Sequence, residues 1–184
     1  FLLALVSFLT GFAKGGFNAL AALMTPLLSL MMTPAEAVGI VLLLYLIGDA
    51  FAVYTYRGEW NWPVVLSMLP AAVVGSLAGT WLLTVLSPGG LRWLLAVFVL
   101  FLVAYKVASD RLQAFRYNPQ AWHGPLAGGV AGVFSGMFNS GGPTFNAYLL
   151  LQKLEPRAFV ATASLFFAVL NLVKEMKGPI LCLV

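Results

Sequence analysis

Long runs of apolar residues follow one another along almost the whole 184-residue chain. A helix that crosses the hydrocarbon core of a bilayer needs about 20 apolar residues, and the chain holds about six such runs. Charged residues make up only 9% of the sequence and lie mostly between the runs. We therefore expect an all-α fold, a polytopic transmembrane helix bundle. The pattern excludes a water-soluble domain, a disordered chain and a protein with a single membrane anchor.

The few ionisable and metal-binding residues exclude several kinds of site. The net charge of +4 is small and lies in the loops, where it fits orientation in a bilayer and not nucleic-acid binding. A single cysteine, Cys182, excludes an internal disulfide, and a single histidine, His123, excludes a multi-histidine metal site. We expect no cofactor, no metal and no nucleic-acid partner; the lipid bilayer is the expected surrounding, and the oligomeric state stays open.

Two of the runs are too long for one upright span and are interrupted in the middle. Residues 1–32 contain a glycine-rich stretch from Gly11 to Asn18, and residues 122–151 contain another from Gly136 to Pro143. Glycine, asparagine and proline are poor residues for a helix interior. We therefore predict two broken helices, each made of two half-helices. The other predicted helices cover residues 34–56, 64–86, 91–108 and 156–173.

The two interrupted runs match each other, which predicts an internal repeat. In the same alignment, with one inserted residue, Asp49 falls opposite Asn171. We expect a first repeat at 1–108, a basic cytoplasmic loop at 109–121, and the first half of a second, truncated repeat at 122–184. The residues that coincide at a constant offset of 121 are Gly11, Gly15, Phe17 and Asn18 with Gly132, Gly136, Phe138 and Asn139.

The sequence leaves the topology of the broken runs open, because they can cross the membrane or return as re-entrant hairpins. The positive-inside rule places the Arg57 loop and the loop at 109–121 in the cytoplasm in both cases. We expect discontinuous spans in parallel repeats. Lys174 is interpreted as an interfacial residue whose side chain extends toward the headgroups.

The broken glycine-rich runs, the Pro-initiated helix after each and the stretch Tyr56-Arg57-Gly58-x-Trp60 together resemble the TauE/SafE family of sulfite exporters. The resemblance covers the whole chain. It implies a bundle of two repeats in the cytoplasmic (inner) membrane that moves small sulfur-containing anions or organosulfonates. The resemblance also implies two final helices in the second repeat that do not follow in this sequence, so we expect a truncated chain.

Ten residues of the broken runs form the predicted substrate site. The N-terminal ends of half-helices carry unpaired N–H groups and partial positive charge, and glycine lets an anion approach the backbone. The alternative is that the glycines only allow close helix packing, as those at 128, 132 and 136 could on one face. The predicted site residues are Lys14, Gly15, Gly16, Asn18, Gly136, Asn139, Ser140, Gly141, Gly142 and Thr144.

Asp49 is the candidate for proton coupling, because a carboxylate inside a membrane span is costly and therefore points to function. The alternatives are a charge pair with Lys14 or Arg57, or a position near the membrane interface. Lys14 itself is left open between anion contact, structural pairing and an interfacial position.

A secondary active permease for such anions is the predicted function, and a passive anion channel is the alternative. An intramembrane enzyme is not supported, because His123 precedes Ser135 on the same half-helix and no His-Glu-x-x-His motif is present. We predict no catalytic residues.

Overall fold

The computed structural model describes residues 18–111 and 120–181, which form seven helices and no strand. This confirms the predicted all-helical fold. Within the described ranges, three helices are long and apolar enough to cross a membrane: α3, α4 and the portion Pro156–Met176 of α8. The helices are α2 (Asn18–Leu28), α3 (Pro34–Thr55), α4 (Trp62–Val85), α5 (Pro88–Arg111), α6 (His123–Phe138), α7 (Gly142–Leu151) and α8 (Pro156–Leu181).

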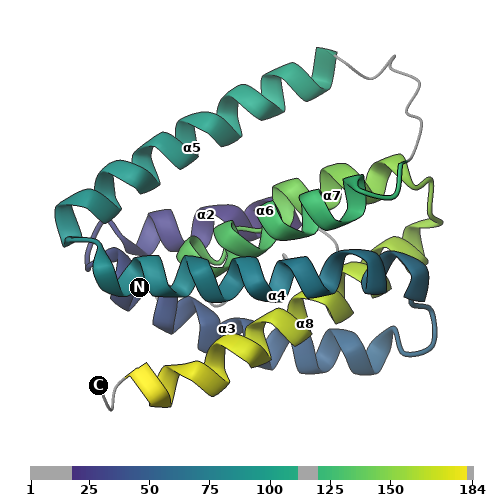
Figure 1. Cartoon of the computed structure of the whole chain (residues 1–184), viewed down its shortest axis with the longest axis horizontal. Coiled ribbons are helices and arrows are strands. Elements are labelled where there is room, and N and C mark those ends of the chain that lie inside the picture. Colours follow the sequence, from purple (N-terminus) through teal and green to yellow (C-terminus); the bar gives the residue numbers. More distant parts are fainter. Residues whose placement is uncertain (1–17, 112–119, 182–184) are drawn as a thin grey trace.

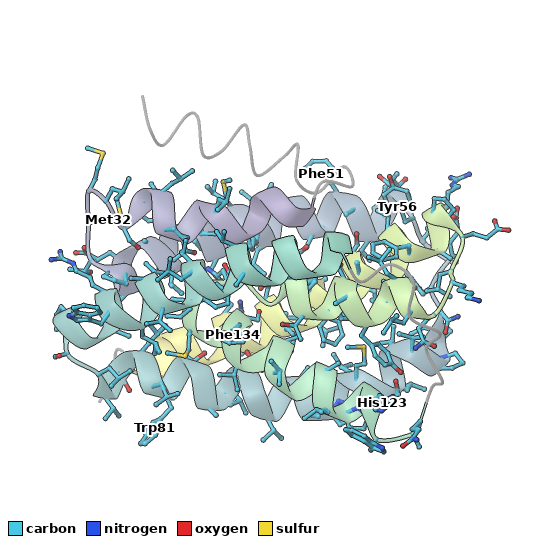
Figure 2. The ribbon with its side chains drawn as sticks, turned by 90° about the horizontal axis from the view of Figure 1, so that it is seen from above. Met32, Phe51, Tyr56, Trp81, His123 and Phe134 are labelled. Atoms are coloured by element: carbon cyan, nitrogen blue, oxygen red, sulfur yellow. The ribbon has the colours of Figure 1, made fainter. Side chains whose placement is uncertain are left out.

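Most of the helices run nearly parallel to one long axis, and α5 diverges from the rest (Figure 1). In that view α3 and α8 cross beneath α4, while α2, α6 and α7 lie above it, between α4 and α5. The first half of α5 stays attached to the bundle because Leu95 and Phe98 pack on Met137 and Phe138 at the end of α6. The loops at the two ends of the bundle separate well in Figure 2, where Met32 lies at one end and Tyr56 and His123 at the other.

The start of α3 is set by residues that satisfy its first amides. The Thr33 hydroxyl accepts a hydrogen bond from the Glu36 N–H, and the Glu36 carboxylate accepts one from the Thr33 N–H at 2.9 Å. Pro34 occupies the first turn, where no donor is needed. The predicted Pro-initiated start of this helix is therefore confirmed.

Helices α4 and α6 pack through glycine along their whole shared length. A Cβ atom added to Gly132 would collide with the carbonyl oxygen of Ala72, and one added to Gly79 would collide with that of Val133. The two backbones are so close that no side chain fits at the crossing points. Small residues at membrane helix interfaces allow this close approach. Two further contacts on α6 repeat the pattern: Gly128 on Met68 and Gly136 on Ser76.

Helices α6 and α7 form a hairpin, so the expected discontinuous span over residues 122–151 is wrong. Trp122, just before α6, lines the same groove as Leu151, the last residue of α7. A Cβ added to Gly124 near the start of α6 would lie 3.2 Å from the Tyr148 hydroxyl near the end of α7. The chain therefore enters the bundle along α6, turns at residues 139–141 and returns along α7. Hydropathy cannot predict this reversal, because the residues of α7 are equally apolar whether the chain continues or turns back.

Helices α3 and α8 run antiparallel, so the expected parallel orientation of these matched helices is also wrong. The N–H of Asn61, just after α3, donates to Thr162 in the second turn of α8 at 2.9 Å. At the same end Arg157 forms an ion pair with Glu59 at 3.2 Å. Helix α8 therefore starts where α3 ends. If the two halves of the chain are repeats, they are inverted relative to each other.

Candidate functional site

The turn between α6 and α7 centres on Asn139. Its backbone has a left-handed conformation, with φ 53° and ψ 27°, which asparagine tolerates better than most residues. The N–H of Asn139 donates to the Ser135 carbonyl at 3.0 Å, and that of Ser140 donates to the Phe134 carbonyl at 3.2 Å. These bonds close the C-terminal end of α6. The next helix starts at Gly142, so its first amides have no intrahelical acceptor.

A buried lysine from α8 reaches this turn. The Lys174 side chain is only 4% exposed, and its ammonium donates to Asn139 Oδ1 at 2.6 Å. It also donates to the carbonyl oxygen of Ser135 at 3.2 Å and to its hydroxyl at 3.3 Å. The interpretation of Lys174 as an interfacial residue is wrong. Its cation is stabilised by the negative end of the α6 dipole and by polar oxygens inside the bundle.

Asn139 also contacts the first half of the chain. Its amide nitrogen donates to the Val38 carbonyl of α3 at 2.8 Å, and the residue is 5% exposed. Both polar atoms of this amide are therefore hydrogen-bonded: the oxygen accepts from Lys174, and the nitrogen donates to α3. Asn139 joins three parts of the fold, namely α3, the α6–α7 turn and α8.

Asp49 lies buried between α3 and α8. It is 2% exposed, and its carboxylate accepts a hydrogen bond from Asn171 at 2.6 Å. Asn171 is the residue that falls opposite Asp49 in the repeat alignment. Asp49 is therefore enclosed by the helices around it. Asn171 and Lys174 are one helical turn apart on α8, so they face the same side.

We call Asp49, Ser135, Asn139, Asn171 and Lys174 the polar core. All five are nearly inaccessible to solvent, and they come from α3, α6, the following turn and α8. A charged group at this depth is costly unless it is paired, hydrogen-bonded or functional. The polar core is therefore the strongest candidate for a functional site among the residues that the structure describes.

Other predicted site residues lie around this core in different roles. The Ser140 hydroxyl is buried and donates to the Phe138 carbonyl at 3.1 Å. Gly136 packs on α4, and a Cβ added to Gly141 would collide with the Ala131 carbonyl oxygen. Close packing is thus a sufficient reason for both glycines. A valine at 141 would distort the turn itself and would be a poor probe of substrate contact.

Thr144 and Gly142 lie on the α7 side of the turn. Gly142 is half-buried at the first position of α7. Thr144 lines a mainly apolar groove of about 360 Å³ between α6 and α7, together with Trp122, Leu126 and Tyr148. The structure therefore does not bring Thr144 into the polar core.

The matching half of the predicted site cannot be placed in the same way. Lys14, Gly15 and Gly16 lie outside the described residues. Asn18 is the first residue of α2. The structure accordingly locates the second-half residues of the predicted site and leaves the first-half residues as predictions.

Sequence reasoning missed Ser135, Asn171 and Lys174 as one group. The missing signal was the length of the last helix, which was predicted to end at residue 173 but runs from Pro156 to Leu181. A long apolar helix that carries Asn171 and Lys174 on the same side would have indicated a buried polar cluster. Among the described residues no group of three or more His, Cys, Asp or Glu side chains could hold a metal ion.

Comparison with known proteins gives the family. The model of the family described as sulfite exporter TauE/SafE matches residues 3–175, which is nearly the whole chain. The chain belongs to the TauE/SafE family. No curated protein and no solved structure matches it. The TauE/SafE family is a family of membrane transporters for sulfur-containing anions and not of enzymes, which agrees with the apolar helices and with the predicted membrane transporter.

Proposed function

We propose that this TauE/SafE protein is a secondary active permease for small sulfur-containing anions such as sulfite or organosulfonates, embedded in the cytoplasmic membrane. The observation that carries the proposal is the buried Lys174 ammonium at the α6–α7 turn. A buried positive charge offsets the hydration that a small anion loses when it leaves water. Its neighbours at the turn, Asn139 and Ser135, add polar groups without adding charge.

The residues around the turn suit binding that must be reversible. Charge-assisted hydrogen bonds are about twice as strong as neutral ones, so one ammonium provides much of the attraction. Neutral hydroxyls, such as those of Ser135 and Ser140, then orient the oxygens without trapping the ion. The first amides of α7, at Gly142 and Thr144, are additional donors at the positive end of a helix.

The first half of the chain enters the proposal through the sequence match alone. Lys14, Gly15, Gly16 and Asn18 belong to the run that matches α6 and the following turn. At the same offset Lys14 falls opposite Ser135, the residue that Lys174 contacts. Each half of the chain would then contribute one lysine to an anion route at mid-membrane depth.

Asp49 is the proposed proton carrier of a secondary active mechanism. The Asp49→Asn variant preserves the size of the side chain and still allows a hydrogen bond with Asn171. We expect this variant to fold normally. It should lose at least about 80% of the additional flux that a proton gradient drives, because an amide does not take up a proton at physiological pH. The measurement is sulfite flux into proteoliposomes with and without an imposed pH gradient. Full stimulation by the gradient in this variant would remove Asp49 from the coupling mechanism.

Sulfite flux in proteoliposomes tests the function itself. We expect flux that saturates with sulfite concentration, exceeds that of protein-free vesicles and responds to an imposed proton gradient. Carbonate and chloride at equal concentration serve as competing anions without sulfur. Flux that increases linearly with concentration and ignores the gradient would instead support the passive channel. Absence of any sulfite flux from folded, inserted protein would contradict both.

A further inference from the structure

We propose that Asn139 is an internal stand-in for the substrate. Its amide oxygen occupies the position on the Lys174 ammonium that an anion oxygen takes, and its amide nitrogen ties this position to α3. Binding of the anion would then release α3 from the α6–α7 turn. This inference rests on the proposed function, in which Lys174 attracts the anion.

The first step of the inference is the short contact between Asn139 and Lys174. The ammonium donates to Asn139 Oδ1 at 2.6 Å, whereas its two contacts with Ser135 are 3.2 and 3.3 Å long. A buried ammonium must be hydrogen-bonded when no ligand is present, because an unsatisfied charge at this depth is very costly. The amide oxygen is one of the acceptors that meet this need, and it carries no charge of its own. A sulfite or sulfonate oxygen carries negative charge, so it is a stronger acceptor and can replace the amide oxygen.

The second step is the link to α3. The same amide donates to the Val38 carbonyl at 2.8 Å, so its two ends cannot move independently. Rotation of the Asn139 side chain away from Lys174 also breaks or bends the bond to α3. Binding of an anion to the Lys174 ammonium would thereby change the contact with α3, a helix in the other half of the chain.

The third step is the backbone of Asn139. With φ at 53°, it sits at the C-terminal end of α6, where the chain reverses into α7. A residue at such a turn can change its side-chain contacts without disturbing the interior of a helix. The matched contact of α3 with α8, between Asp49 and Asn171, involves different atoms and can stay in place.

The test compares anion binding with transport in two Asn139 variants. Glycine adopts the left-handed backbone without strain, so Asn139→Gly removes the amide and retains the turn. We expect this variant to bind sulfite about three- to tenfold more tightly, as one competing hydrogen bond is lost. Its sulfite flux in proteoliposomes should fall at least about fivefold, because release and the link to α3 are both impaired. Asn139→Asp supplies a fixed counter-ion to Lys174 and should weaken sulfite binding at least about tenfold.

The controls separate this inference from the proposed function. Lys153 also has a left-handed backbone, with φ 51°, and lies exposed in the α7–α8 turn, so Lys153→Gly is the matched glycine control. It should leave both binding and flux unchanged. Weaker sulfite binding in Asn139→Gly would make Asn139 a substrate ligand and overturn the stand-in role, while leaving the proposed function in place. Tighter binding with normal flux would overturn the link to α3. Failure of the unmodified protein to bind sulfite would overturn the proposed function itself.

Discussion

The Gly132→Ala variant is expected to lose about 2–3 kcal/mol of its free energy of unfolding. A Cβ atom at this position would collide with the carbonyl oxygen of Ala72 on α4. Overpacking of a well-packed interior typically costs about 1–3 kcal/mol, and here the opposing atoms are backbone and cannot rotate away. Separation of α4 from α6 would also disturb the α6–α7 turn. The measurement is unfolding in mixed micelles with increasing denaturing detergent.

Gly129→Ala is the matched control for that experiment. Gly129 lies on the same helix, but a Cβ added there would meet nothing closer than 3.9 Å. Alanine favours a helix over glycine by about 1 kcal/mol, so this variant should be equally stable or more stable than the unmodified protein. Opposite signs for the two variants are expected. Equal effects would show that the close contact between α4 and α6 contributes no more than general helix propensity.

Loss of the Lys174 charge is expected to remove sulfite binding. We predict that Lys174→Gln weakens binding about 10- to 100-fold, the range for losing a hydrogen bond to a charged group. Glutamine at this position can still donate a hydrogen bond to Asn139 and Ser135, and the free energy of unfolding is measured in parallel to show that the variant is folded. Lys153→Gln removes an exposed lysine and should change neither quantity. A stable Lys174→Gln variant with normal sulfite affinity would exclude Lys174 from the binding site.

The helices of the bundle could be predicted from the sequence because their ends carry local signals. The start of α3 follows from Thr33 and Pro34, and the break in residues 122–151 follows from glycine, asparagine and proline within an apolar run. These signals act over a few residues, so no tertiary information is needed. The C-terminal end of α8 has no such signal. Its polar residues after 173 resemble an interfacial end, although the helix continues to Leu181.

The direction of α7 could not be predicted, for a physical reason. A glycine-rich turn allows the chain either to continue across the membrane or to reverse, and the residues of α7 are equally apolar in both cases. The choice depends on packing: Gly124 lies against Tyr148, and Gly141 lies against Ala131. Such contacts join residues distant in the sequence and become visible only in the folded chain.

The candidate site was predicted in part. Asn139 was selected for its place in the broken run, and the structure puts it at the turn beside a buried cation. Its partner Lys174 was assigned to the membrane interface, since a lysine near the end of an apolar run ordinarily extends toward water. Burial depends on the neighbouring helices, which a single sequence does not describe. The same limitation hid the contact between Asp49 and Asn171.

Crystals soaked with selenite, a heavier analogue of sulfite, test most directly whether the polar core holds the anion. An anomalous difference map locates selenium without relying on a fitted model of the ligand. We predict a selenium peak close enough to Lys174 for a selenite oxygen to lie within about 3 Å of Nζ. The Asn139 amide oxygen should be displaced from the ammonium. A peak confined to the groove beside Trp122 and Thr144, or none at the α6–α7 turn at concentrations that saturate binding, would contradict the assignment of the site to Lys174.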